Sequence, residues 1–354
     1  MPGFQAWTTQ NDVETLHHIR QTTNTFAVSY SFRRAVSVSL LSTQGSTFYQ
    51  CVACNETQPE SEPIRQTGIA DTQLSIGYRI PQTDFVVSTL LNLPTGNPTL
   101  SAQTLPLATF QSNQVLALRM PQMGQGFGAQ IGISGAFQLT DLLVLGGGFS
   151  YQKSGGFQPL DTFMETYHPG AEWTADLGGT LRIGERGTWG FDVLGTQYQT
   201  DTFADAPVFK AGRKLALTSQ FRYVLDNQEF GVYARYRSRE KNTIAQFLGD
   251  EMMPESTNSN PAVSSLKGLY RFRLNPAWRT TITADYRSYA TTSAVFSGSR
   301  VFGLGIEPDF QLSERFSMPV RLRLQRGTMR NEAFSADPIR LSSISLLAGL
   351  AANF

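Results

Sequence analysis

The sequence predicts an all-β protein, a transmembrane antiparallel up-and-down β-barrel with short periplasmic turns and long extracellular loops. Three observations support this fold class. Apolar residues recur at every second position in many segments, as in β-strands, whose alternate side chains point to opposite faces of the sheet. Short connections alternate with long ones along the chain. The last segment, residues 342–354, carries an unbroken apolar row and ends on an aromatic residue.

Alternating rows define fifteen strands, and a single-chain bacterial barrel normally has an even number. We therefore favour 16 strands, with the missing one inside residues 4–18. The alternative is 14 strands, with one weak assignment or one segment folded into the lumen. Residues 1–23 are thus an N-terminal segment, either first strand or lumen plug, and residues 24–354 form the barrel. The fifteen rows lie in residues 26–32, 36–40, 74–80, 85–93, 127–137, 143–151, 173–181, 189–195, 215–225, 230–236, 266–274, 278–286, 302–306, 316–324 and 342–354.

The connections differ in length and composition. The short ones contain turn residues and are centred on residues 33–34, 81–84, 139–141, 184–187, 226–228, 275–276 and 313–315. The long ones span about residues 44–67, 95–123, 153–168, 199–212, 240–262, 290–299 and 328–340. Counting back from the last strand puts every short turn on one side of the barrel, which we assign to the periplasm.

Composition is compatible with this architecture. Charged residues make up 16% of the chain and hydrophobic residues 40%, as expected when only alternate strand residues face lipid. No apolar run is long enough for a membrane-spanning helix. The net charge of +1 gives no field that would attract nucleic acid, so we expect no such partner. The start, Met1 to Phe4, has neither a basic nor an apolar signal region, so we expect a mature or re-engineered start.

The terminal strand also carries a resemblance. Its apolar row is Ile344, Leu346, Ala348, Leu350, Ala352 and Phe354. This pattern resembles the closing strand of bacterial outer-membrane barrels, in which a terminal Phe is the signal read by the barrel-assembly machinery. The resemblance implies that Phe354 is an assembly signal and that the protein lies in the outer membrane of a Gram-negative envelope. It also implies contact with outer-membrane lipid and lipopolysaccharide.

Two short stretches resemble a family more closely. Gly68-Ile69-Ala70-Asp71 opens a strand that ends in Gly77-Tyr78-Arg79, and Leu93-Pro94-Thr95-Gly96 follows the next strand. This order is similar to that in the outer-membrane proteins of the meta-pathway of phenol degradation, relatives of long-chain fatty-acid and aromatic-hydrocarbon transporters. The resemblance covers about residues 1–150. It implies passage of hydrophobic or aromatic compounds.

The sequence offers little for catalysis or metal binding. Cys51 and Cys54 are the only cysteines, and we interpret them as a local disulfide in an exposed loop of an oxidising compartment. A metal site would need a second pair of ligands. The three histidines, His17, His18 and His168, stand in no catalytic motif. We expect no enzyme activity, no cofactor and no metal.

The strongest functional signal is the row opposite the apolar one. In the C-terminal half this row is basic, and charge facing lipid would cost about 2–4 kcal/mol per residue at the bilayer midplane, so it should face the lumen. Two interpretations stay open: a basic pathway that favours anionic or polar solutes, or an interior braced by arginine–carboxylate pairs. The predicted lumen-lining residues are Arg222, Arg235, Arg237, Lys267, Arg271, Arg273, Arg279, Asp285, Arg287, Arg321 and Arg323.

These observations favour an outer-membrane channel for passive passage of small solutes, including hydrophobic or aromatic compounds. Residues 95–123, a long and only mildly polar stretch, are a candidate for a constriction that folds inward. The alternative is a plugged barrel that anchors a protein partner in the envelope through its long loops.

Overall fold

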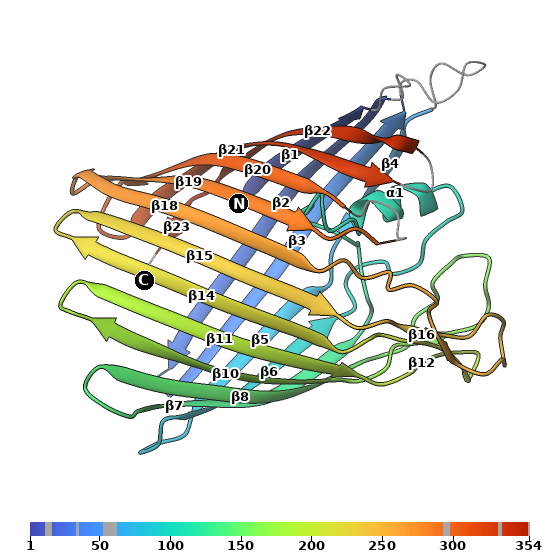
Figure 1. Cartoon of the computed structure of the whole chain (residues 1–354), viewed down its shortest axis with the longest axis horizontal. Coiled ribbons are helices and arrows are strands. Elements are labelled where there is room, and N and C mark those ends of the chain that lie inside the picture. Colours follow the sequence, from blue (N-terminus) through green and yellow to red (C-terminus); the bar gives the residue numbers. More distant parts are fainter. Residues whose placement is uncertain (11–15, 33–34, 52–61, 293–297, 332–334, 353–354) are drawn as a thin grey trace.

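The fold is a closed antiparallel β-barrel with long loops at one end and short turns at the other (Figure 1). It is seen in a computed structural model that describes residues 1–10, 16–32, 35–51, 62–292, 298–331 and 335–352. The barrel segments are β1 (Pro2–Gln10), β2 (Leu16–Phe32), β3 (Val36–Cys51), β4 (Ile64–Ile69), β5 (Thr72–Arg79), β6 (Phe85–Leu93), β7 (Gly128–Gln138), β8 (Leu143–Ser154), β10 (Glu172–Ile183), β11 (Gly187–Tyr198), β14 (Lys214–Leu225), β15 (Gln228–Arg239), β18 (Val263–Asn275), β19 (Trp278–Tyr289), β20 (Arg300–Gln311), β21 (Phe316–Asn331), β22 (Ser335–Ala348) and β23 (Ala351–Ala352).

These segments make sixteen spanning strands. The sheet contains 18 segments, but β4 and β5 continue each other along β3, and β22 and β23 do so along β21. The strand that the sequence left unassigned is β1, which pairs with β2 on one side and with β22 on the other. The prediction of 16 strands is confirmed, and the alternative of 14 is wrong.

The apolar rows face outward. On β14 and β15 the side chains of Leu215, Leu217, Phe230 and Val232 are exposed, and their neighbours along each strand point to the opposite face. A soluble barrel would not leave continuous apolar rows uncovered around its outside. The exposed rows therefore match a barrel whose outer surface meets lipid.

Several strands are longer than their apolar rows. β2 begins at Leu16 and β3 runs to Cys51, whereas the sequence predicted strands over 26–32 and 36–40. β21 likewise reaches Asn331. The boundaries predicted for the loops 44–67 and 328–340 are therefore wrong. Outward side chains in these extensions are mostly polar, so they interrupt the apolar row although the backbone pairing continues toward the long-loop end.

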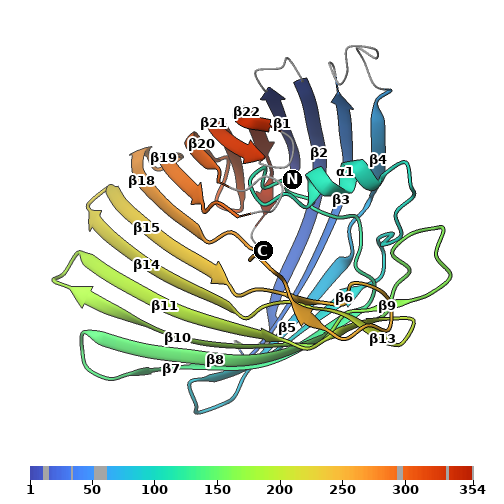
Figure 2. The ribbon, with the colours of Figure 1, turned by 45° about the vertical axis from the view of Figure 1, so that its right-hand side comes forward.

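Three of the long loops are tied together by a small second sheet. It consists of β9 (Tyr167–His168), β12 (Asp201–Phe203), β13 (Ala206–Lys210), β16 (Thr243–Ile244) and β17 (Met253–Pro254). Figure 2 shows these strands beyond one side of the barrel mouth. In the described residues, no helix is both long and apolar enough to cross a membrane.

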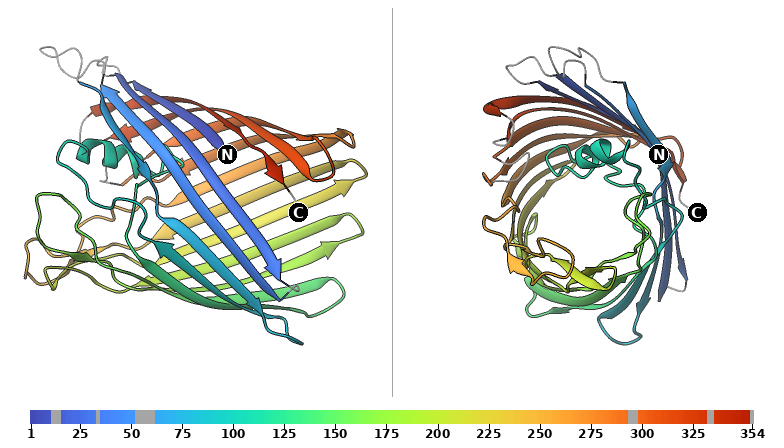
Figure 3. Two further views of the ribbon diagram at one scale, coloured as in Figure 1. Left: turned by 180° about the vertical axis from the view of Figure 1, so that it is seen from behind. Right: turned by 90° about the vertical axis from the view of Figure 1, so that its right-hand side faces the viewer.

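The loop between β6 and β7, residues 94–127, folds into the barrel, and we call it the inward loop. It contains the helix α1 (Leu105–Gln111), whose Leu107 and Gln111 are buried. Figure 3 shows α1 inside the ring of strands, seen from the long-loop end. The prediction that residues 95–123 fold inward is confirmed.

Apolar residues on both partners explain why the loop lies there. Val115, Leu116 and Leu118 of the inward loop form a buried cluster with inward-facing side chains at the long-loop end of the wall. Burying such surface is favourable by about 25 cal/mol per Å². The wall residues of this cluster are Trp7, Ile19, Tyr289, Val301, Met329 and Leu341.

Candidate functional site

The structure places all eleven predicted lumen residues on inward rows. On β15, for example, Arg235 and Arg237 alternate with the exposed Val232 and Tyr236. The inward direction is independently marked by Arg237, which donates a hydrogen bond to Gln114 of the inward loop. The eleven residues come from β14, β15, β18, β19 and β21.

Arginine–carboxylate pairs join neighbouring strands near the short turns. Glu229 on β15 accepts hydrogen bonds from Arg222 at 2.8 Å and from Arg271 at 2.9 Å, which links three consecutive strands. The prediction missed Glu229. The parity of the row could have found it, since it precedes the outward-facing Phe230 and must point inward.

Asp285 holds the most buried pair of this wall. Its side chain is 8% exposed, and it accepts a hydrogen bond from Arg323 at 2.6 Å. Arg287 lies 3.9 Å away on the other side. Two more pairs, Arg279 with Asp309 and Arg321 with Glu307, lie in more exposed surroundings, where each contributes only about 0–1 kcal/mol.

Four of the predicted basic residues have no ion pair within the described part of the chain: Arg235, Arg237, Lys267 and Arg273. Arg235 and Lys267 are exposed although they point into the barrel. The wall therefore combines a layer of paired charges with basic groups that have no carboxylate partner among the described residues.

The inward loop adds one further cation to the lumen. Arg119 lies in the loop, and burial, followed by the positive charge of Arg321, lowers its pKa from the usual value. An arginine with a lowered pKa still carries its proton at neutral pH. Arg119 and Arg321 therefore repel each other across the space between loop and wall.

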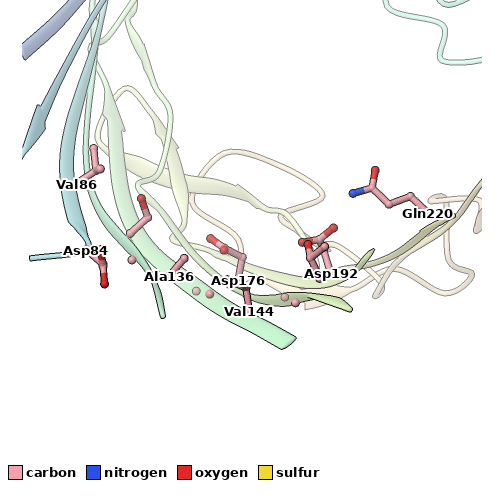
Figure 4. A pocket seen from close by; sticks show the side chains of 14 residues that line it. Asp84, Val86, Ala136, Val144, Asp176, Asp192 and Gln220 are labelled. Carbon is pink, nitrogen blue, oxygen red and sulfur yellow. The ribbon is translucent and has the colours of Figure 1, made fainter. Parts of the chain in front are cut away.

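The opposite wall contains many small side chains. Around a hollow of about 390 Å³, strands β7, β8 and β10 present Ser134, Ala136, Gly146, Gly178 and Thr180 to the interior. Figure 4 shows Asp176 of β10, Asp192 of β11 and Gln220 of the adjacent strand β14 lining this hollow. The basic groups without an ion pair thus lie on one side of the lumen, and the carboxylates of Asp176 and Asp192 lie on the other.

Glycines let the acidic side chains lie flat on this wall. A Cβ added to Gly148 would lie 2.8 Å from the carboxylate oxygen of Asp176, and one on Gly178 would collide with Asp192. Each carboxylate therefore occupies the space that a neighbouring side chain would take. Gly146 and Gly148, which lie on the inward row of β8, keep the lumen wide at this point.

Polar contacts fix the inward loop on the wall. The side chain of Gln21 on β2 donates to the carbonyl of Met120 at 2.9 Å and accepts from the Met120 amide at 2.9 Å. On β3, Tyr49 stacks on Phe110 of α1 and contacts His17 at 3.1 Å. His17 thus packs between strands and loop, as a structural histidine would.

Asp71, between β4 and β5, binds both ends of the inward loop. Its carboxylate accepts hydrogen bonds from the amides of Gly96 at 2.9 Å and Gln125 at 2.5 Å. The Asn92 side chain donates to it as well, at 2.9 Å. We call this arrangement the Asp71 clamp. It brings together the stretches 68–71 and 93–96, which the sequence singled out only for their order.

Two glycines make the clamp possible. A Cβ on Gly96 would collide with the carbonyl oxygen of Met123, and a Cβ on Gly124 would lie 2.9 Å from the backbone of Gly96. The two ends of the loop therefore cross in backbone contact. Larger residues at either position would separate the ends and displace the loop.

A second carboxylate organises the outer loops. Glu255 accepts hydrogen bonds from the side chain of Asn242 at 2.7 Å and from the amide of Ser259 at 3.1 Å. Burial alone would raise the pKa of Glu255, but these hydrogen bonds outweigh burial and lower the pKa below 4.5. Asn242 in turn accepts from the Gly212 amide at 3.1 Å, so the network connects two loops.

This network predicts an acid-sensitive loop. Because the folded pKa of Glu255 is lowered, its contribution is present above pH 4.5 and is lost as the pH falls through the folded pKa. We expect a nitroxide label at Leu248→Cys to become more mobile as the pH falls through the lowered pKa of Glu255, since hydrogen bonds to a charged group contribute about 1.5–3 kcal/mol. In Glu255→Gln the label should be mobile at pH 7 and insensitive to acid. Equal mobility of both proteins at every pH would contradict this role.

The other predicted sites lie at or beyond the edge of the described residues. Cys51 ends β3, where it is buried and disulfide-bonded. Its predicted partner Cys54 lies outside the described residues, so the pairing stays a prediction. Phe354 also lies outside them, and its role as an assembly signal stays a prediction.

Solved structures share this fold. A TodX variant described as a monoaromatic hydrocarbon channel matches with a TM-score of 0.52 and 8% identity, over 100% of this chain and 89% of that one. The outer membrane protein OpdK of Pseudomonas aeruginosa matches with a TM-score of 0.45 and 11% identity, over 99% and 98%. OccK5 of the same organism gives 0.44 and 11%, over 100% and 97%. No family model and no curated protein matches the sequence. The chain has the fold of outer-membrane channels.

Proposed function

We propose that this protein is a passive channel of the bacterial outer membrane for small solutes, without enzymatic activity. The observation that carries the proposal is the solvent exposure of charged side chains that point inward. The side chains of Arg222, Arg279 and Arg321 are 54%, 47% and 49% exposed. Exposed charged side chains that point into the barrel are typical of a water-filled interior. The channel described for the TodX variant supports the same function.

The charges suggest which solutes pass. Unpaired basic groups on β15 and β18 would attract anions, and the inward loop narrows the lumen beside Arg237. We propose small anionic solutes, including aromatic carboxylates, as the preferred cargo. The resemblance to transporters of hydrophobic and aromatic compounds supports the aromatic part of this proposal. An uncharged hydrocarbon would meet few apolar side chains on the basic wall.

Planar-bilayer recording tests the channel. We expect discrete openings from the purified protein and a reversal potential in a salt gradient that indicates anion preference. A folded barrel, verified by circular dichroism and heat-modifiable gel mobility, that carries no current would overturn the proposal.

The selectivity should depend on the unpaired cations. In the triple variant Arg235→Gln, Arg237→Gln, Lys267→Gln we expect the anion-to-cation permeability ratio to fall by about threefold or more, because charges lining a pore set its ion preference. The matched control, Arg79→Gln, Arg186→Gln, Arg315→Gln, removes three positive charges at short turns. It should leave the ratio nearly unchanged. Equal changes in both variants would refute the assignment of selectivity to these residues.

One observation favours a second candidate, an anchor for an envelope partner. Large apolar side chains are exposed on the long loops, with Met164 at 96%, Phe247 at 76% and Met253 at 59%. Exposed apolar groups at loop tips suit protein contacts. Under this candidate the folded barrel would pass no current, so the bilayer recording separates the two functions.

A further inference from the structure

An arginine cluster lies on the outside of the barrel, above the apolar surface. Arg300, Arg326 and Arg340 are exposed and occupy outward rows of β20, β21 and β22. They surround Thr328: Arg300 and Arg340 are its partners on the two neighbouring strands. Arg326 lies two residues along its own strand. We call these three residues the outer arginine cluster.

The spacing of the cluster follows from the pairing. Neighbouring strands lie about 4.8 Å apart and alternate residues of one strand about 6.8 Å apart. Three guanidinium groups therefore surround a single small hydroxyl side chain. Like charges at this separation repel one another, and a bound anion would relieve the repulsion.

No protein carboxylate relieves it in the described part of these strands. The outward rows of β20, β21 and β22, and of β1 to β4 beside them, hold no Asp or Glu among the described residues. Three more arginines extend the basic surface. Arg330 lies two residues beyond Thr328 on β21, and Arg20 on β2 and Arg65 on β4 flank Phe48, with Arg20 5.9 Å from its ring centre.

The apolar surface begins directly below the cluster. On β20 the outward residues after Arg300 are Phe302 and Leu304, and on β22 Ile344 and Leu346 follow Ser342. All four are exposed. Positive groups above hydrocarbon-facing side chains match a lipid with anionic groups above its acyl chains. The cluster faces the long-loop end, which in such barrels is the outer leaflet.

We propose that the outer arginine cluster binds the phosphate groups of a phosphorylated glycolipid of the outer leaflet, the lipid A headgroup. Arginine forms paired hydrogen bonds to phosphate oxygens, and the hydroxyls of Thr328 and Ser342 lie between the guanidinium groups to bind the remaining oxygens. This site is independent of the solute pathway, because the side chains point away from the lumen.

The test compares lipid binding by the purified, delipidated barrel and two matched double variants. Arg300→Gln/Arg326→Gln removes two charges of the cluster. Lys153→Gln/Arg213→Gln removes two exposed charges outside the cluster, one on β8 and one directly before β14. The probes are diphosphoryl lipid A, its dephosphorylated form and phosphatidylethanolamine, measured by native mass spectrometry in detergent. Circular dichroism and heat-modifiable gel mobility establish that each variant is folded.

We expect the wild type to bind diphosphoryl lipid A in preference to the other two probes. The cluster variant should lose at least about tenfold in affinity, since each basic residue near an anionic headgroup is worth about fivefold, and the control variant should stay within about twofold. Equal binding by the wild type and the cluster variant would overturn the proposal. Equal binding of phosphorylated and dephosphorylated lipid A would also overturn the proposal. So would a competition experiment in which only a soluble polyanion such as heparin, and no phosphorylated lipid, displaces bound lipid A.

Discussion

Asp285→Ala should destabilise the barrel by about 3–5 kcal/mol. The substitution leaves Arg323 and Arg287 without the carboxylate that lies between them, and an uncompensated buried charge is costly. Asp285 is 7% exposed, so water can replace little of the lost interaction. The free energy of unfolding, measured by urea titration in lipid vesicles, provides the readout.

Asp309→Ala is the matched control for this prediction. Asp309 pairs with Arg279 at 2.5 Å, but the Arg279 side chain is 47% exposed, so water compensates the loss. We expect about 1 kcal/mol or less. Removing Arg323 as well, in Asp285→Ala/Arg323→Met, should recover only part of the stability, because Arg287 still lacks its carboxylate. Equal losses in the two single variants would show that burial does not distinguish the two pairs.

Asp71→Ala should release the inward loop. Three hydrogen bonds to the carboxylate are lost, and hydrogen bonds to charged groups contribute about 1.5–3 kcal/mol each. The ends of the loop then separate while the apolar cluster around Leu116 remains. We expect larger and noisier single-channel currents than in the wild type, because the loop narrows the lumen.

The control for this prediction is Asp226→Asn. Asp226 lies at a short turn, its side chain is 81% exposed, and its nearest cation is 3.9 Å away. Its φ of 47° is also tolerated by asparagine. The control should conduct like the wild type. A quiet, unchanged current from Asp71→Ala would mean that the apolar contacts alone hold the loop in place.

The fold was predictable because lipid imposes a strict pattern. A strand whose outward residues must all be apolar leaves a period-two signal in the sequence. The pattern weakened where the outside met water: Arg20, Thr22 and Asn24 on β2 interrupt the apolar row, although β2 pairs with β3 throughout. The first strand, β1, gave only a weak signal because its outward residues are mostly small or polar.

The site was predictable in composition but not in pairing. Row parity identified the inward arginines, because charge on the lipid side is costly. Which of these arginines pair with a carboxylate depends on the register between neighbouring strands. That register cannot be inferred from the residue pattern of one strand. The same holds for Asp71, whose partners Gly96 and Gln125 stand 25 and 54 residues away along the chain.

The small sheet of β9, β12, β13, β16 and β17 determines which loop residues lie together on the surface at the long-loop end. Its pairings join the loops that follow β8, β11 and β15, such as Phe203 with Tyr167 and Phe209 with Ile244. An antibody raised against the native surface would therefore contact residues from three loops at once. Synthetic peptides copied from any one loop would make poor vaccines or diagnostic antigens.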